Sequence, residues 1–305
     1  MEHNPYLRPM GLSEILDKSI KLYRKKFFTL VKAQFPQTCF LLTYILFSQY
    51  VLEEIATLSI FGQLLFDILT YYLLFGTRYL WIVCALFFIH AVIVYPLVLS
   101  AVTRVTSDSI LENPLSVKKA YTRSFPHLWE MGLTNLALSV VVPAVMVASI
   151  SVSFVILIFL EVDILSSTVF FIDAILIVVL LALFPALLLW TFWAVVYPVM
   201  VNEDVFGVKS LKRSWSMVKG QRVTVFFSMF LIFLVPFMAY FTSFMLVRVM
   251  HIQPDVLYPV STGVIQGVLM PLVHVTRVVI YFELKARKEG LDLERRVETL
   301  AELSP

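Results

Sequence analysis

Six apolar stretches, each long enough to cross about 30 Å of hydrocarbon, constrain this chain more than any other feature. Their approximate limits are 28–50, 79–103, 132–160, 169–201, 223–249 and 258–282. The composition agrees, since 60% of the 305 residues are hydrophobic and the mean hydropathy is +0.88. We therefore predict an all-α, polytopic membrane protein with six transmembrane helices in a single membrane domain, residues 1–285.

A cationic amphipathic segment precedes a span three times, near residues 12–27, 114–129 and 208–219. Apolar side chains on one face and cations on the other are typical of a helix lying in the membrane interface. An ungapped alignment of SIKLYRKKFFTL, AYTRSFPHLWEM and SWSMVKGQRVTV superposes Ser19, Ala120 and Ser214. We expect interfacial or headgroup contacts from Lys18, Lys21, Arg24, Lys25, Lys118, Lys119, Arg123, Lys209, Lys212, Arg213, Lys219, Trp129 and Trp215.

Together these segments predict three direct repeats of two spans each, over about 11–105, 114–201 and 208–285, related by a pseudo-threefold axis. The outward spans carry Pro36, Pro143 and Pro236, and the returning spans are expected to close at Tyr95-Pro96, Tyr197-Pro198 and a degenerate Tyr281-Phe282. Proline bends a membrane helix and frees a carbonyl group. These bends are either packing kinks or the outline of a central cavity.

The distribution of charge predicts the orientation. Twenty-one of the 24 Lys and Arg residues fall on one side of the six spans, which places the N-terminus, the basic loops and the C-terminus in the cytoplasm. Residues 51–77 then form an external interfacial or re-entrant element. Residues 286–305 form a charged cytoplasmic tail, either a solvated helix or a docking segment. No apolar signal-peptide core precedes the first span, so we expect that span to be retained in a bacterial cytoplasmic membrane.

Polar residues within spans are the candidates for a functional site, because an ionisable group in hydrocarbon is costly. The candidates are Arg277, His274, Gln266, His90 and Asn135. Arg277 either snorkels to lipid headgroups or faces the bundle interior, where it would hold an anionic headgroup or pair with Glu130 or Glu283. His90 and Asn135 are either hydrogen-bonded packing residues or part of a relay.

The chain resembles one bacterial family. Its opening MGLSEILDKSIKLYRKKFFTL, the Tyr-Pro pairs followed by SLKRSWSMVKG, and the closing YFELKARKEGLDLE are similar to the glycerophosphoryl diester phosphodiesterase membrane-domain family. The resemblance implies a membrane domain without the catalytic barrel of the fused members. It implies a location and no activity.

No catalytic or metal-binding pattern is present in the sequence. The five His residues are scattered, no HxH, HExxH or DxD spacing occurs, and Cys39 and Cys84 both fall within spans. We expect no metal, no cofactor, no catalytic residue and no nucleic-acid partner.

Three functions compete on this basis. The first is a non-enzymatic scaffold or subunit of an envelope complex that contacts anionic lipids and a membrane-protein partner or a second copy. The second is a transporter or channel for a lipid or amphiphile through a cavity between the repeats. The third is a membrane-embedded lipid enzyme. A closed bundle would favour the scaffold, and a polar or lipid-filled cavity would favour transport.

Overall fold

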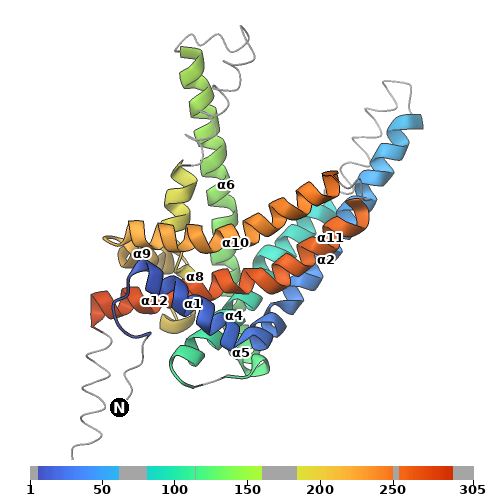
Figure 1. The fold of residues 1–305 in the computed structure, drawn as a ribbon. Helices are drawn as coiled ribbons and strands as arrows, with labels where there is room; N and C mark the ends of the chain where they lie inside the picture. Colours follow the sequence, from blue (N-terminus) through green and yellow to red (C-terminus); the bar gives the residue numbers. More distant parts are fainter. Residues whose placement is uncertain (1–5, 62–80, 114, 160–183, 250–253, 291–305) are drawn as a thin grey trace, which may run out of the picture.

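A computed structural model describes residues 6–61, 81–113, 115–159, 184–249 and 254–290 (Figure 1). Every regular element in these ranges is a helix, so the all-helical prediction is confirmed. Five helical runs are long and apolar enough to cross a membrane, as expected for a multi-pass membrane protein. They are Trp81–Ile110, Val117–Val152, Phe184–Glu203, Arg222–Leu246 and Pro259–Glu289.

The first predicted span lies in α2 (Phe27–Phe61), which is helical but is not one of these five runs. The count of six spans therefore stays a prediction. Helix α2 also continues through residues 51–61, which were expected to belong to a separate external element. The rest of that expected element, residues 62–77, lies outside the described residues, as does the charged tail from residue 291 onward.

Helix α12 (Met270–Glu289) lies at the centre of the packing. It contacts α1 (Leu12–Lys25), α4 (Tyr95–Ile110) and α10 (Arg222–Val249), and its side chains from Pro271 to Thr276 are all buried. In Figure 1, α12 crosses the lower part of the molecule between α1 and α4. A helix buried on most faces needs mainly apolar side chains all round, which its sequence supplies between Met270 and Phe282 except at His274 and Arg277.

Each amphipathic segment forms a helix that packs on a returning helix. Helix α5 (Val117–Ser124) packs on α4, and α9 (Val208–Val218) packs on α8 (Val196–Glu203). The first amphipathic helix, α1, packs on the last returning helix, α12, although they lie at opposite ends of the sequence. The first and last segments of the chain thus form a third pair of the same kind.

The three small residues superposed by the sequence alignment are all buried in the folded chain. Ser19, Ala120 and Ser214 have no exposed surface. A larger side chain at any of them would separate the amphipathic helix from its partner, because close-packed helices approach to about 8–10 Å.

The returning helices are interrupted just before a proline. Proline has no N–H, so a carbonyl of the preceding turn loses its helical partner, and π-helical turns often accommodate the change. The breaks are π-helix η1 (His90–Val94) before Pro96, the turn of residues 193–195 before Pro198, and π-helix η3 (Ile265–Leu269) before Pro271.

A side-chain donor satisfies one carbonyl at each break. Asn135 Nδ2 donates to the Ala91 oxygen over 2.8 Å, and Ser214 Oγ donates to the Phe192 oxygen over 2.8 Å. The Tyr23 hydroxyl donates to the Val268 oxygen. An unsatisfied carbonyl in hydrocarbon costs several kcal/mol, so these donors make the breaks tolerable within a membrane.

The positions of the breaks change two expectations. Pro36, Pro143 and Pro236 lie inside α2, α6 (Leu128–Phe159) and α10, which continue through them as α-helices. The third counterpart of Tyr95-Pro96 is Met270-Pro271, which also follows a π-helix directly, whereas Tyr281 lies inside α12. None of the returning helices ends at its aromatic–proline pair, and they continue to Ile110, Glu203 and Glu289.

Helix α6 approaches η1 closely because residue 132 is a glycine. A Cβ atom at Gly132 would lie 2.3 Å from the Val92 carbonyl oxygen and 2.8 Å from Val92 Cγ1. Gly132 and Asn135 share one face of α6, at a spacing of three residues. The same face therefore provides both the close contact and the donor for the Ala91 carbonyl.

We predict that Gly132→Val destabilises the protein, because the backbone of α6 or η1 must move to accommodate the new side chain. Overpacking of this kind costs about 1–3 kcal/mol, which lowers the midpoint of thermal unfolding by several degrees. Circular dichroism of detergent-purified protein measures that midpoint. Gly11→Val is the matched control, since nothing lies within 4 Å of a Cβ there. Equal midpoints for the two variants would contradict the close contact.

Candidate functional site

A pocket of about 270 Å³ lies where η1, α6, the turn before α8 and α12 meet. The pocket is partly open, and its apolar lining includes Phe87, Leu138 and Leu189. Its interior combines aromatic side chains with a small number of polar groups, which is the usual composition of a small-molecule site. The polar groups belong to His90, Tyr95, Asn135, Ser139, Tyr197 and Arg277.

Arg277 is the only charged residue that lines this pocket. Its Nε atom is buried and has no hydrogen-bond partner among the described residues. The two acids expected as partners are occupied elsewhere: Glu130 contacts His127 Nδ1 at 3.1 Å, and Glu283 contacts Arg287 at 2.7 Å. The guanidinium group therefore keeps donors available for a ligand in the pocket.

Arg277 lies in the pocket lining, although it is not deep in the predicted span. It lies five residues before residue 282, where that span ends, or about 7.5 Å along α12 at 1.5 Å per residue. A long arginine side chain can cover such a distance to reach headgroups. Its place in the lining of the pocket supports the interior interpretation.

His90 and Asn135 lie with Arg277 in the pocket, and both also pack. The His90 ring stacks on Phe40 with centroids 5.5 Å apart and lies 5.7 Å from the Tyr95 ring. Asn135 uses its amide nitrogen on the Ala91 carbonyl. The structure therefore combines two interpretations that the sequence left open, a hydrogen-bonded packing role and a place beside the arginine.

The other two candidates do not line this pocket. His274 lies one turn before Arg277, is buried, and has no hydrogen-bond partner for either ring nitrogen among the described residues. Gln266 lies in η3, where its Oε1 atom is 3.5 Å from the Tyr240 hydroxyl oxygen. His274 is close enough to Arg277 for their charges to interact, which makes it a neighbour of the site and not part of its wall.

Sequence reasoning missed three members of the pocket, Trp190, Trp193 and Tyr197. Tyr197 is almost fully buried, and its hydroxyl has no hydrogen-bond partner in the described part of the chain. Its ring lies 6.0 Å from the Tyr95 ring in an edge-to-face arrangement. The paired Tyr-Pro motifs were the available signal, but they were interpreted as ends of spans.

The structure corrects the expectation that Lys18 contacts lipid headgroups. This residue is only 8% exposed, and its Nζ contacts Glu14 at 3.0 Å and the Met10 sulfur at 3.1 Å. A cation held in this way does not reach lipid headgroups. The hydrogen bond between the Lys18 and Glu14 side chains lowers the pKa of Glu14 below its usual value.

Arg213 is also engaged within the protein. It donates to Glu203 from Nε over 2.7 Å and from Nη2 over 3.1 Å, and it pairs with Glu289 of α12. Hydrogen bonds to Glu203 raise the pKa of Arg213 above its ordinary value. The Tyr281 hydroxyl donates to the same Glu203 carboxylate over 3.0 Å. This network joins α8, α9 and α12.

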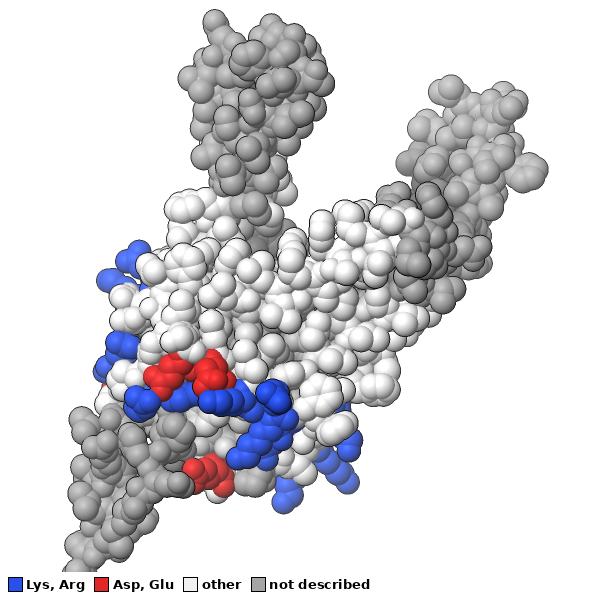
Figure 2. All heavy atoms as spheres, in the orientation of Figure 1, with Lys and Arg blue, Asp and Glu red and all other residues white. Residues whose placement is uncertain are grey.

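The remaining predicted interfacial side chains are exposed. Figure 2 shows Lys and Arg gathered toward one end of this face, while a broad surface beyond them carries no charge. Exposed phenylalanines such as Phe230, Phe237 and Phe241 cover the uncharged part of α10. The exposed members of the predicted set are Lys21, Arg24, Lys25, Lys118, Lys119, Arg123, Lys209, Lys212, Lys219, Trp129 and Trp215.

Comparison with known proteins gives no assignment, because no family model matches the chain and no curated protein or solved structure is similar to it. The resemblance to the glycerophosphoryl diester phosphodiesterase membrane-domain family thus stays a prediction from motifs. Within the described residues, no group of three or more His, Cys, Asp or Glu side chains could hold a metal ion.

We predict that Asn135→Leu destabilises the protein by about 1–3 kcal/mol, because it leaves the Ala91 carbonyl without its donor in an apolar setting. Urea or thermal unfolding in detergent measures the change. Ser139→Ala, in the same pocket, is the control and should alter stability by less than about 0.5 kcal/mol. Equal losses in the two variants would show that the hydrogen bond is unimportant.

Proposed function

We propose that this protein is a non-enzymatic membrane protein that binds the anionic group of an amphiphile at Arg277 and belongs to the transporter class of the functions considered above. The observation that carries the proposal is Arg277, a half-buried cation in the pocket lining whose buried Nε atom has no hydrogen-bond partner among the described residues. A buried cation is costly unless an anion accompanies it, and no carboxylate among the described residues does so.

The other polar groups suit an anionic oxygen acceptor. The Tyr197 hydroxyl is free to donate, and His90 offers a ring nitrogen from the opposite wall. A volume of 270 Å³ lies just below the range of about 300–1,000 Å³ that is usual for drug-sized ligands. The pocket therefore suits a headgroup or a small acid more than a whole lipid.

The shape of the site favours binding over a purely structural role. A closely packed bundle without a cavity, with His90, Asn135 and Arg277 directed to lipid, would favour the scaffold function. These three residues instead line one cavity. Apolar side chains in its lining, Phe87 and Leu138 among them, allow a hydrocarbon tail to continue into the bilayer while its headgroup stays inside.

The proposal includes the membrane arrangement predicted from the sequence. The six spans, the three repeats and the cytoplasmic surface helices are supported by the three helix pairs that share buried Ser19, Ala120 and Ser214. The grouping of cations at one end supports cytoplasmic termini in a bacterial plasma membrane (Figure 2).

We predict that Arg277→Leu removes the bound amphiphile. Charge-assisted hydrogen bonds contribute about 1.5–3 kcal/mol, so binding should weaken roughly 10- to 100-fold. Membrane insertion should stay normal, because leucine enters a bilayer more readily than arginine. Mass spectrometry of lipids and other amphiphiles retained after purification in mild detergent measures the effect.

Two variants complete this experiment. Arg277→Lys keeps the charge but loses the forked geometry, so it should retain the amphiphile in part. Lys212→Leu removes an exposed cation and should retain it fully. If Arg277→Leu and Arg277→Lys both retain the same molecules as the parent, the Arg277 pocket is not a binding site and the proposed function is wrong.

We predict that tags fused at Glu2 and at Pro305 are inaccessible to antibody or protease in intact cells and become accessible after the membrane is opened. The reason is the excess of cations on one side of the spans. A tag at either end that reacts from outside intact cells would overturn the proposed topology.

A further inference from the structure

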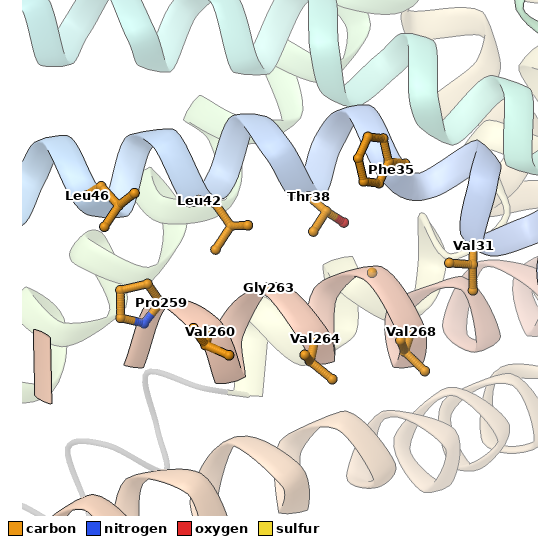
Figure 3. Close-up of a pocket in the computed structure, with 11 residues that line it drawn as sticks. Val31, Phe35, Thr38, Leu42, Leu46, Pro259, Val260, Gly263, Val264 and Val268 are labelled. Carbon is orange, nitrogen blue, oxygen red and sulfur yellow. The ribbon is translucent and has the colours of Figure 1, made fainter. Parts of the chain in front are cut away.

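A long groove runs along the face of α2 that is turned toward α11 (Pro254–Val264) and η3, and its volume is about 580 Å³. Figure 3 shows Leu42 and Leu46 of α2 directed toward α11. The lining side chains of α2 recur every three or four residues from Val31 to Leu46, as expected for one face of a helix.

The lining of the groove is hydrocarbon. The Thr38 hydroxyl is its only polar side-chain group, and it donates to the Gln34 carbonyl of its own helix over 3.4 Å. An occupant with amide, hydroxyl or charged groups would leave them unsatisfied, at a cost of several kcal/mol for each group. The opposite wall belongs to Pro259–Glu289, one of the runs suited to cross a membrane, so hydrocarbon is the available occupant.

The length of the groove suits an extended acyl chain. From Val31 to Leu46 the groove extends about 22 Å, which exceeds the depth of one leaflet, half of a hydrocarbon core of about 30 Å. A helix of a second copy is the alternative occupant, and the test below distinguishes the two.

Two glycines keep the groove open. A Cβ at Gly263 would lie 2.9 Å from Leu42 Cδ2, and a Cβ at Gly267 would lie 3.1 Å from Thr38 Oγ1. Side chains at these positions would push α11 and η3 away from α2 or fill the space between them. The protein therefore leaves this volume unfilled by its own side chains.

Cations lie near one end of the groove. The Tyr23 hydroxyl bonds to the Val268 carbonyl, which brings the last turn of α1 beside that end. Arg24 and Lys25 follow Tyr23 and are exposed. Each cation near a membrane surface attracts an anionic headgroup by about 1 kcal/mol.

We infer that this groove holds one acyl chain of an anionic phospholipid, whose headgroup lies beside Arg24 and Lys25. The inference does not depend on the Arg277 pocket. Phe40, which stacks on His90 of that pocket, lies about 200° around α2 from Thr38 and Leu42 of the groove.

Photolabelling tests the inference. Full-length protein is reconstituted in phosphatidylcholine vesicles containing a small fraction of phosphatidylglycerol with a photoreactive diazirine in one acyl chain. Peptide mass spectrometry then locates the adducts. We expect adducts on the groove residues of α2 and α11 several-fold above those on Val147, which is 64% exposed on α6. Equal labelling of the two surfaces would show only the surrounding lipid and would overturn the inference.

Two filling variants and a matched control refine the test. Val260 and Val264 line the groove and are each 56% exposed, so Val260→Phe and Val264→Phe can occupy it without displacing buried side chains. Each should reduce labelling in the groove several-fold, whereas Val147→Phe should leave it unchanged. Labelling that persists in both filling variants would contradict the inference. Arg277→Leu should leave groove labelling unchanged, which separates this result from the proposed function.

Two further experiments identify the occupant. Phosphatidylcholine that carries the same photoreactive acyl chain should label the groove several-fold less than the phosphatidylglycerol probe does. Equal labelling by the two lipids would show that the groove does not select an anionic headgroup. A second copy is tested by Val264→Cys in a chain carrying Cys39→Ser and Cys84→Ser, since both natural cysteines are exposed. Efficient disulfide dimerisation of that variant would place a second chain in the groove and overturn the assignment to lipid.

Discussion

Hydrogen bonds from side chains of other helices to backbone carbonyls join the parts of this protein where a helix is interrupted before a proline. Asn135 of α6 donates to the Ala91 carbonyl, five residues before Pro96, whose missing N–H leaves that carbonyl of the π-helix without a helical partner. At the other two interruptions, Ser214 of α9 donates to the Phe192 carbonyl and Tyr23 of α1 donates to the Val268 carbonyl. Helices α1 and α9 are thus each joined by a hydrogen bond to the interrupted helix that lies beside it.

The pocket lies beside one of the three interruptions, the π-helix η1. There Asn135 of α6 donates to the Ala91 carbonyl, and Gly132, on the same face of α6, lies against Val92. Asn135 also lines the pocket together with Arg277. The face of α6 that packs on this interruption thus forms part of the polar site.

Much of the helical fold could be predicted from the sequence, because apolar length and amphipathic spacing are local properties. The alignment of Ser19, Ala120 and Ser214 identified three positions that are fully buried in the structure. The pairing of α1 with α12 could not be predicted, since nothing in a local pattern says which distant helix an apolar face will meet. The interruptions were also missed, because Pro36, Pro143 and Pro236 lie in uninterrupted helices while Pro96, Pro198 and Pro271 follow the breaks.

The candidate site was predictable in part for the same reason. An arginine in an apolar run is visible in the sequence, and so are His90 and Asn135, but their meeting in one pocket depends on tertiary packing. The Tyr-Pro motif that contains Tyr197 was interpreted as the end of a span, because aromatic residues are common there, and Trp190 and Trp193 carried no further signal. The burial of Lys18 was equally hidden, since an amphipathic pattern gives the face of a helix and not the partner that covers it.

Helix α2 lies between the polar pocket at Arg277 and the hydrocarbon-lined groove, so one amphiphile cannot use both. On one side, Phe40 stacks on His90 beside a pocket that has polar groups but only 270 Å³ of space. On the other side, Thr38 and Leu42 face a groove of 580 Å³ whose lining is hydrocarbon. A lipid whose chain lay in the groove could not bring its headgroup to Arg277 without passing through the helix. The two proposals therefore require different molecules, a lipid whose chain lies between α2 and α11 and a separate anionic ligand at Arg277.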